Sequence, residues 1–176
     1  ITMTKLMWLN GWKNDELNQT YTPLKFDKHF PSEKLKPYIQ YFVVSESDWE
    51  NEYKIFPSSG LVIGFQFKGQ LFTIQDGALN PLSSAGITGI SDHYKIFKSS
   101  KNIGSVLVYF TETGFTHFVS RPVHELFNES LSLAGIFDKN KVEEVEEKLS
   151  SATTDVQRIK IVEQFLLSQL EYIQTD

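Results

Sequence analysis

Histidine is the side chain most able to bind a metal ion in this sequence, because cysteine is absent. Metal-binding β-barrels usually combine two or three histidines with a carboxylate, commonly starting from a close histidine pair. Here the histidines form neither an HxH nor an HExxH pattern, and they lie far apart, at His29, His93, His117 and His124. We therefore expect no metal site and no cofactor, and we interpret these side chains as solvated or locally hydrogen-bonded.

Motifs for nucleophilic catalysis and phosphate binding are also missing. The sequence has no GxSxG elbow, no GxxxxGK[ST] loop and no GxGxxG after a strand. Residues 86–89 (GITG) carry two glycines without the following long helix, which favours a bulge or a tight corner. Several carboxylates could meet in space, although their spacing does not require it: Asp48, Glu50, Glu52, Asp92 and Glu112. We expect no catalytic residues and a protein that is not an enzyme.

Aromatic side chains are the remaining chemical signal, at 14% of the residues. Such side chains can fill a β-barrel core or line an apolar ligand pocket, and both interpretations stay open. Those in or beside predicted strands are Trp49, Tyr53, Phe56, Phe65, Phe67, Tyr94, Phe97, Tyr109 and Phe110.

The elements that would position these side chains are mostly strands. Alternating, β-branched and aromatic runs predict strands at 38–44, 53–56, 61–67, 71–74, 85–91, 93–97 and 103–110. The run 61–67 places Leu61, Ile63, Phe65 and Phe67 on one face. Residues 68–70 and Asp76-Gly77 read as turns, the first of them a hairpin turn. The run 103–110 is apolar on both faces, which is typical of a central strand.

The sequence becomes helical from Asn140. Asn140 with Glu143 resembles a capping box, and a first stripe consists of Val142, Val145 and Leu149. Thr154 with Gln157 restarts a longer helix whose stripe consists of Val156, Ile159, Val162, Leu166, Leu170 and Ile173. The short link predicts an antiparallel hairpin. The second stripe can pack on the body or meet a second subunit.

We therefore predict an α+β fold in one structural unit. Residues 1–137 form a lead-in and a β-barrel or sandwich body, and residues 138–176 form the helical hairpin. The charge is acidic, with 17 Lys and Arg against 22 Asp and Glu, and only two arginines. This balance is poorly suited to binding a nucleic-acid backbone. No apolar run approaches the roughly 20 residues of a membrane span, and the lack of cysteine fits a reducing cytoplasm.

Seven segments, in a common order, carry a family resemblance: residues 30–42, 56–67, 86–89, 106–115, 121–126, 131–133 and 158–166. Together they resemble the N-terminal sensor domain of AraC-type transcriptional regulators, in a cupin-like subgroup. The likeness runs from about Tyr21 to Leu170. Two departures stand out: Ser58 occupies the place of the subgroup's usual aspartate, and residues 111–113 (TET) replace its proline-containing turn.

The resemblance implies a bacterial, cytoplasmic regulator whose cupin-like barrel senses an unidentified small-molecule effector. It also implies a homodimer, and DNA binding only through a C-terminal domain of two helix-turn-helix units that this chain lacks. On that basis we predict ligand contacts from Phe65, Phe67 and Tyr109, with Tyr53 and His93 as polar contacts. The predicted dimer contacts are Ile159, Val162, Leu166 and Leu170.

Two alternatives remain beside the sensor. One is a stand-alone cupin-type enzyme that acts on a small metabolite, which would need a convergent set of histidines and carboxylates. The other is a dimerisation module whose barrel is filled by its own side chains.

Overall fold

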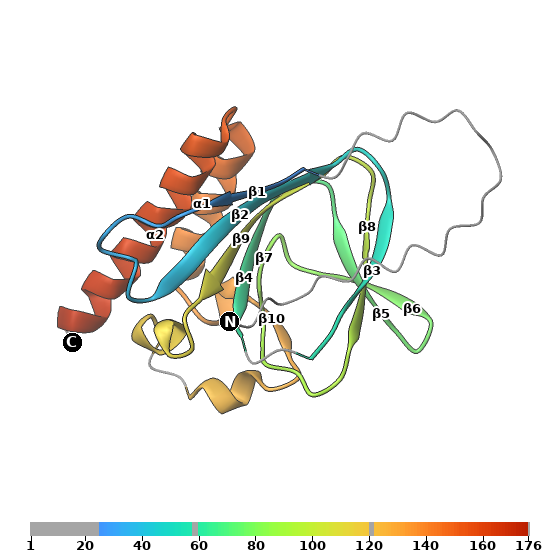
Figure 1. Ribbon diagram of the computed structural model, residues 1–176, viewed down its shortest axis with the longest axis horizontal. Helices are drawn as coiled ribbons and strands as arrows, with labels where there is room; N and C mark the ends of the chain where they lie inside the picture. The colour runs from blue at the N-terminus through green and yellow to red at the C-terminus, as the bar shows by residue number, and fades with distance from the viewer. Residues whose placement is uncertain (1–24, 58–59, 120–121, 176) are drawn as a thin grey trace.

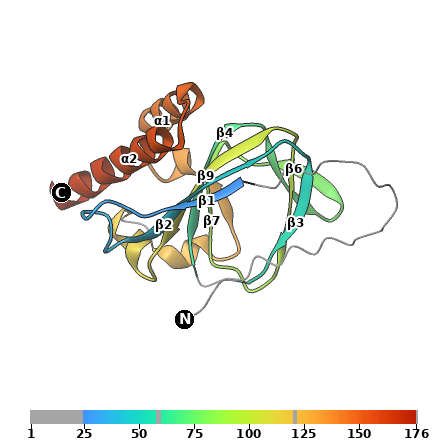
Figure 2. The ribbon, with the colours of Figure 1, turned by 45° about the horizontal axis from the view of Figure 1, so that its top comes forward.

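The structure is a computed structural model that describes residues 25–57, 60–119 and 122–175, with side chains through residue 170. Two antiparallel β-sheets form the body, and two C-terminal helices lie against the larger sheet (Figure 1). Figure 2 shows the helices on one side of the larger sheet and the smaller sheet on the other. The predicted α+β class is therefore confirmed.

The larger sheet has the order β1-β2-β9-β4-β7-β10, with every neighbouring pair antiparallel. Strand β9 lies between β2 and β4, which confirms that the apolar run 103–110 is a central strand. The strands are β1 (Lys25–His29), β2 (Ile39–Ser47), β4 (Val62–Lys68), β7 (Ala85–Thr88), β9 (Ile103–Phe110) and β10 (Ser130–Ser132).

The smaller sheet has the order β3-β8-β5-β6, formed by β3 (Asn51–Ile55), β5 (Leu71–Gln75), β6 (Ala78–Pro81) and β8 (Lys95–Ser99). The hairpin turn predicted at residues 68–70 is wrong, because the chain there passes from the larger sheet to the smaller one. Gly69 has φ +74°, and a Cβ on it would lie 2.8 Å from Ile103 Cα, so the corner needs glycine. The second predicted turn is confirmed: Asp76 and Gly77 join β5 to β6 with φ values of 51° and 77°.

In the described part of the chain, three short 3₁₀ helices precede the hairpin of α-helices: η1 (Gly114–His117), η2 (Val123–Leu126) and η3 (Leu133–Gly135). Helix α1 (Lys139–Ser151) begins earlier than predicted, because Asp138 accepts a hydrogen bond from Lys141 N at 3.2 Å and acts as the cap in place of Asn140. Helix α2 (Asp155–Thr175) begins, as predicted, at the capping box formed by Thr154 and Gln157. Gln157 N donates to Thr154 Oγ1 at 3.3 Å, and Thr154 N donates to Gln157 Oε1 at 3.2 Å.

The hydrophobic core lies between the helices and one face of the larger sheet. The helices contribute Val142, Val145, Leu149, Ile159, Val162, Leu166 and Leu170, all buried. The four predicted dimer contacts thus pack on the chain's own sheet, which corrects the expectation that they face a second subunit. Val156 is 73% exposed and does not belong to the stripe, and the side chain of Ile173 lies outside the described part.

A cluster of charged groups ties the start of α2 to the edge of the larger sheet. Lys25 Nζ lies 2.9 Å from Glu46 Oε1 and 2.7 Å from Asp155 Oδ2. Lys68 Nζ lies 2.7 Å from Glu46 Oε2, and Arg158 Nη1 lies 3.1 Å from Asp155 Oδ1. The cluster joins β1, β2, β4 and α2, so it sets where the helix begins on the sheet.

The stripe on α2 gives the first prediction. Leu166→Ala removes a fully buried side chain and should lower the free energy of unfolding by about 2–5 kcal/mol. Val156→Ala, on the exposed side of the same helix, should change it little. Urea unfolding measures both, and equal effects of the two substitutions would contradict the packing described for α2.

Glu46 gives a prediction on acid stability. Burial raises the pKa of its carboxyl, but hydrogen bonds from Lys68 and Lys25 outweigh burial and leave the pKa below its ordinary value of 4.5. The ion pairs therefore stabilise the fold above that pH, and this stabilisation disappears as the pH falls through the lowered pKa. Glu46→Gln should cost about 1 kcal/mol at neutral pH and much less in acid.

Chemical unfolding across a pH series measures this difference, with Glu147→Gln on the exposed face of α1 as the control. A pH-independent gap between Glu46→Gln and the unsubstituted protein would contradict the assignment of the stabilisation to the charged pairs.

Candidate ligand-binding cavity

A cavity of about 880 Å³ lies between the two sheets, and strands of both sheets line it. This volume falls within the range of about 300–1,000 Å³ that is typical of small-molecule sites. The helices cover the opposite face of the larger sheet (Figures 1 and 2). The larger sheet therefore has one face packed against helices and one face turned to the cavity.

Strand β9 shows this division residue by residue. Val106 and Val108 are buried in the core, while Ser105, Leu107 and Tyr109 line the cavity and are partly buried. Phe110, at the end of the strand, is buried in the core and also borders the cavity. Successive side chains of a strand point to opposite faces, so one strand supplies both surfaces.

The residues of β2 and β4 that pair with Ser105 and Tyr109 of β9 also line the cavity. Tyr41 of β2 and Val62 of β4 pair with Tyr109, and Ser45 and Gln66 pair with Ser105. Small or polar side chains therefore occupy much of this face, where large apolar ones would have filled the space. Gly64 and Gly86, paired between β4 and β7, are part of the same lining.

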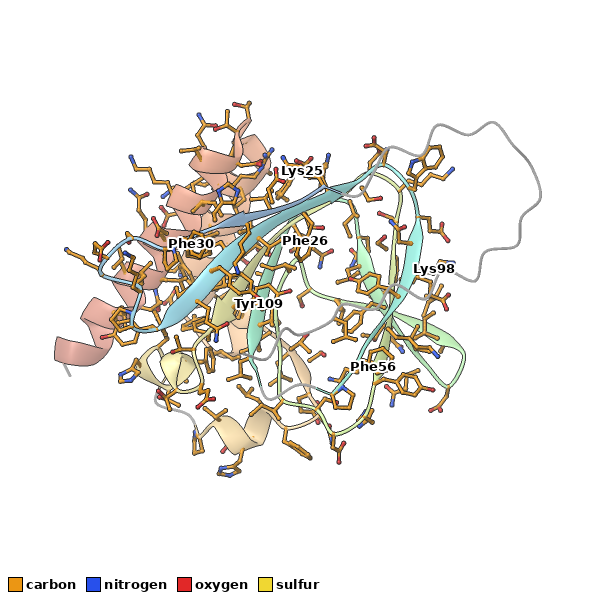
Figure 3. The ribbon with its side chains drawn as sticks, in the orientation of Figure 1. Lys25, Phe26, Phe30, Phe56, Lys98 and Tyr109 are labelled. Carbon is orange, nitrogen blue, oxygen red and sulfur yellow. The ribbon has the colours of Figure 1, made fainter. Side chains whose placement is uncertain are left out.

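Two pairs of stacked aromatic rings occupy the two walls. On the larger sheet, the rings of Tyr41 and Tyr109 have centroids 4.7 Å apart and planes 29° apart. On the smaller sheet, the rings of Tyr53 and Phe97 have centroids 5.8 Å apart and planes 15° apart. Tyr109, near the C-terminal end of β9, is labelled in Figure 3. All four residues line the cavity.

Burial raises the pKa of two of the cavity phenols. It raises the pKa of Tyr53 from its ordinary value of 10.0 to about 12. Burial also raises the pKa of Tyr109, and the charges of Tyr41 and Tyr53 would raise it further. Tyr53 and Tyr109 come from different sheets, and both line the same cavity.

Lys95 reaches across the cavity from the smaller sheet to the larger one. Its Nζ donates to Ser130 Oγ at 3.1 Å, which links β8 to β10. Burial lowers the pKa of Lys95, and the charge of Glu129 opposes this shift to a smaller extent. Lys95 is thus a partly desolvated cation within the lining.

Of the five predicted ligand contacts, the structure brings Tyr53 and Tyr109 into the cavity lining. The prediction that Phe65 and Phe67 line the cavity is wrong. Phe65 packs in the core with its ring 5.9 Å from that of Phe165, and Phe67 lies under the Arg158 guanidinium at 4.0 Å. The predicted grouping of these two on one face holds, but that face is turned to the helices.

His93 is also outside the cavity lining. It precedes β8 in a loop, its side chain is 58% exposed, and its Nδ1 lies 2.9 Å from Asp92 Oδ1. The sequence interpretation missed Tyr41, Gln66, Lys95 and Ser105. Polar residues within otherwise apolar strands, such as Ser105 in β9, were the signal that could have revealed the hollow face.

Among residues 25–57, 60–119 and 122–175, no three His, Asp or Glu side chains gather as a metal ion would require. Within the same ranges, none of the helices is long and apolar enough to span a membrane.

The cavity phenols give a prediction on ionisation. The pKa of Tyr53 is higher in the fold than in the unfolded chain, so its contribution to stability is complete below pH 10.0 and is lost as the pH rises towards 12. Tyr53→Phe should remove one late phenolate absorbance step and make stability less sensitive to alkaline pH. A rapid pH jump reads the absorbance before unfolding.

Tyr94→Phe, at an exposed ring outside the cavity lining, is the matched control and should leave the late step unchanged. Loss of a step at the ordinary tyrosine pKa in Tyr53→Phe would contradict the buried position of this phenol.

One family model matches the chain. It is a domain of unknown function (DUF6597), and the match covers residues 27–132. The matched range runs from β1 to β10 and so includes the strands of both sheets that line the cavity. No curated protein sequence matched the chain. Because the match covers more than half of the chain, the protein belongs to the DUF6597 family.

Proposed function

We propose that this chain is the small-molecule-sensing domain of a bacterial AraC-type transcriptional regulator, with a cupin-like barrel as its sensor. The observation that carries the proposal is the cavity of about 880 Å³ between the two sheets. Its aromatic and hydrogen-bonding lining is typical of a site for a small organic molecule. The proposal places the protein in the cytoplasm, as a homodimer, without a resident cofactor.

The position of the larger sheet supports a sensing mechanism. A ligand that contacts Tyr109 meets the residue between Val108 and Phe110, both of which pack in the core that the helices share. A ligand with different affinities for two arrangements of the helices would shift the equilibrium between them. Helix α2 would pass this shift on to a DNA-binding domain.

The charge of the chain supports the assignment of ligand sensing and DNA contact to different domains. With a net charge of −5 and two arginines, this chain is poorly suited to neutralise a phosphate backbone. The proposal therefore assigns DNA contact to a separate domain of two helix-turn-helix units, and assigns sensing and dimerisation to this chain.

Sequencing the native gene beyond the codon for Asp176 tests the regulator. We expect roughly 100 further residues with paired, arginine-rich helix-turn-helix patterns. A gene that ends near Asp176 would contradict the regulator, and stoichiometric iron, manganese, nickel or zinc in the purified protein would then favour the cupin-type enzyme.

Thermal-shift screening against a metabolite collection tests the sensor. Binding that is selective for the native state raises Tm. Leu107→Trp places a large ring in the cavity lining and should abolish the shift, while Val156→Trp on the exposed side of α2 should not. Hits that survive Leu107→Trp would contradict the cavity as the sensing site.

A further inference from the structure

We propose that the cavity binds a small aromatic carboxylate, with its carboxylate on Lys95 and its ring against the aromatic pairs of the two walls. This inference rests on the proposed function and names the ligand class for the same cavity. Three features carry it: a cation without a carboxylate partner, a hydroxyl beside that cation, and two stacked pairs of rings.

Lys95 differs from its neighbours in its partners. Lys98, on the same strand but the opposite face, pairs with Glu50 at 2.7 Å; Figure 3 labels it on the smaller sheet. Among the described residues, Lys95 forms no ion pair within 4.0 Å, and its hydrogen bond goes to Ser130. A partly buried ammonium without a counter-ion is costly, and an anionic ligand would remove that cost.

The other charges at the cavity do not supply the counter-ion. Glu129 is exposed beside Ser130, and its charge offsets only part of the burial effect on Lys95. Among the described lining residues, the other charged ones are Lys54 and Glu112, both exposed. Lys54 Nζ lies 4.7 Å from the centroid of the Tyr94 ring. Lys95 is therefore the charged group that a ligand inside the cavity would meet.

The donors around Lys95 match a carboxylate better than a phosphate. The ammonium has further hydrogens after its bond to Ser130, and the Ser130 hydroxyl can still donate its own. These two neighbouring donors suit the two oxygens of a carboxylate. A phosphate carries more charge and typically meets several cations, whereas Lys95 and the exposed Lys54 are the basic residues among the described lining.

The rings lie next to the charge. Lys95 and Phe97 point the same way from β8, about 7 Å apart along the strand, and Phe97 pairs with Tyr53 on β3. Tyr41 and Tyr109 form the facing wall. A planar ring can stack on such walls, and the phenol of Tyr109 can donate a hydrogen bond to a substituent on the ring. The distance suits a ring that bears its carboxylate directly or on a short arm.

Calorimetric titration with three probes tests the ligand class on the unsubstituted chain. Benzoate carries both features, benzamide keeps the ring without the charge, and cyclohexanecarboxylate keeps the charge without the aromatic ring. We expect benzoate to bind at least about tenfold more tightly than either of the others, since the loss of one charged hydrogen bond or one stacking contact is worth about that factor.

Variants at Lys95 test the contact itself. Lys95→Met should weaken benzoate binding by about tenfold or more, Lys95→Arg should retain most of it, and Lys98→Met should leave it unchanged. Circular dichroism and Tm confirm that each variant folds. The comparison of benzoate with benzamide does not depend on any variant.

The outcomes separate this inference from the proposed function. Equal binding of benzoate and benzamide, unchanged binding in Lys95→Met, or no benzoate binding at millimolar concentration would each overturn the aromatic carboxylate. The proposed sensing function would still be supported if another metabolite raises Tm in the unsubstituted protein and does not raise it in Leu107→Trp. Benzoate binding that persists in Leu107→Trp would overturn the inference, because the site would lie outside the cavity.

Discussion

The two faces of the larger sheet are covered in different ways. One face packs against α1, α2 and their preceding turns, while the other faces the smaller sheet across a cavity of about 880 Å³. The alternation along β9 enforces this difference, since Val106 and Val108 are core residues and Ser105 and Tyr109 line the cavity. A shift of one residue in register would exchange the two sets. The helical hairpin, the cavity and the proposed sensing all depend on this division.

The division also explains how a ligand could act on the helices. The sheet is one strand layer thick, so a side chain that a ligand meets and a side chain that a helix meets are consecutive along the chain. The charged cluster at Glu46 and Asp155 fixes the start of α2 on the same sheet. A change in strand position at the cavity therefore has a direct physical route to the helix that leads to the C-terminus.

Much of the fold could be predicted from the sequence, because strand and helix periods are local properties. The run 103–110 and the capping box at Thr154 and Gln157 were found at their observed positions. The corner at Gly69 could not be predicted as a crossing between sheets, since the contact that demands it comes from Ile103, far away in the sequence. The cap was placed at Asn140 rather than Asp138 because both residue types are good caps.

The site was predicted less completely for a related reason. Period-two alternation shows which residues share a face, but it does not show which face is packed and which is hollow. The prediction that Phe65 and Phe67 share one face of their strand is correct, but the prediction that this face lines the cavity is wrong. Both side chains pack with the core, because large apolar groups are most stable where they are closely packed. Tyr53 and Tyr109 line the cavity as predicted, but that prediction came from the family resemblance and not from the alternation. The place of Lys95 in the cavity lining could not be predicted from the sequence, because it depends on the pairing of β8 with β3 and on the position of β10.

The most direct test of the cavity face of the larger sheet compares two neighbouring positions of β9. Ser105→Phe would extend a ring into the cavity, and Val106→Phe would force the same ring into the packed core. We expect Ser105→Phe to keep the free energy of unfolding within about 1 kcal/mol of the unsubstituted protein, and Val106→Phe to lower it by about 1–3 kcal/mol or more. Comparable losses in the two variants would contradict the presence of a cavity on this face of the larger sheet, because the face that carries Ser105 would then be packed as tightly as the core.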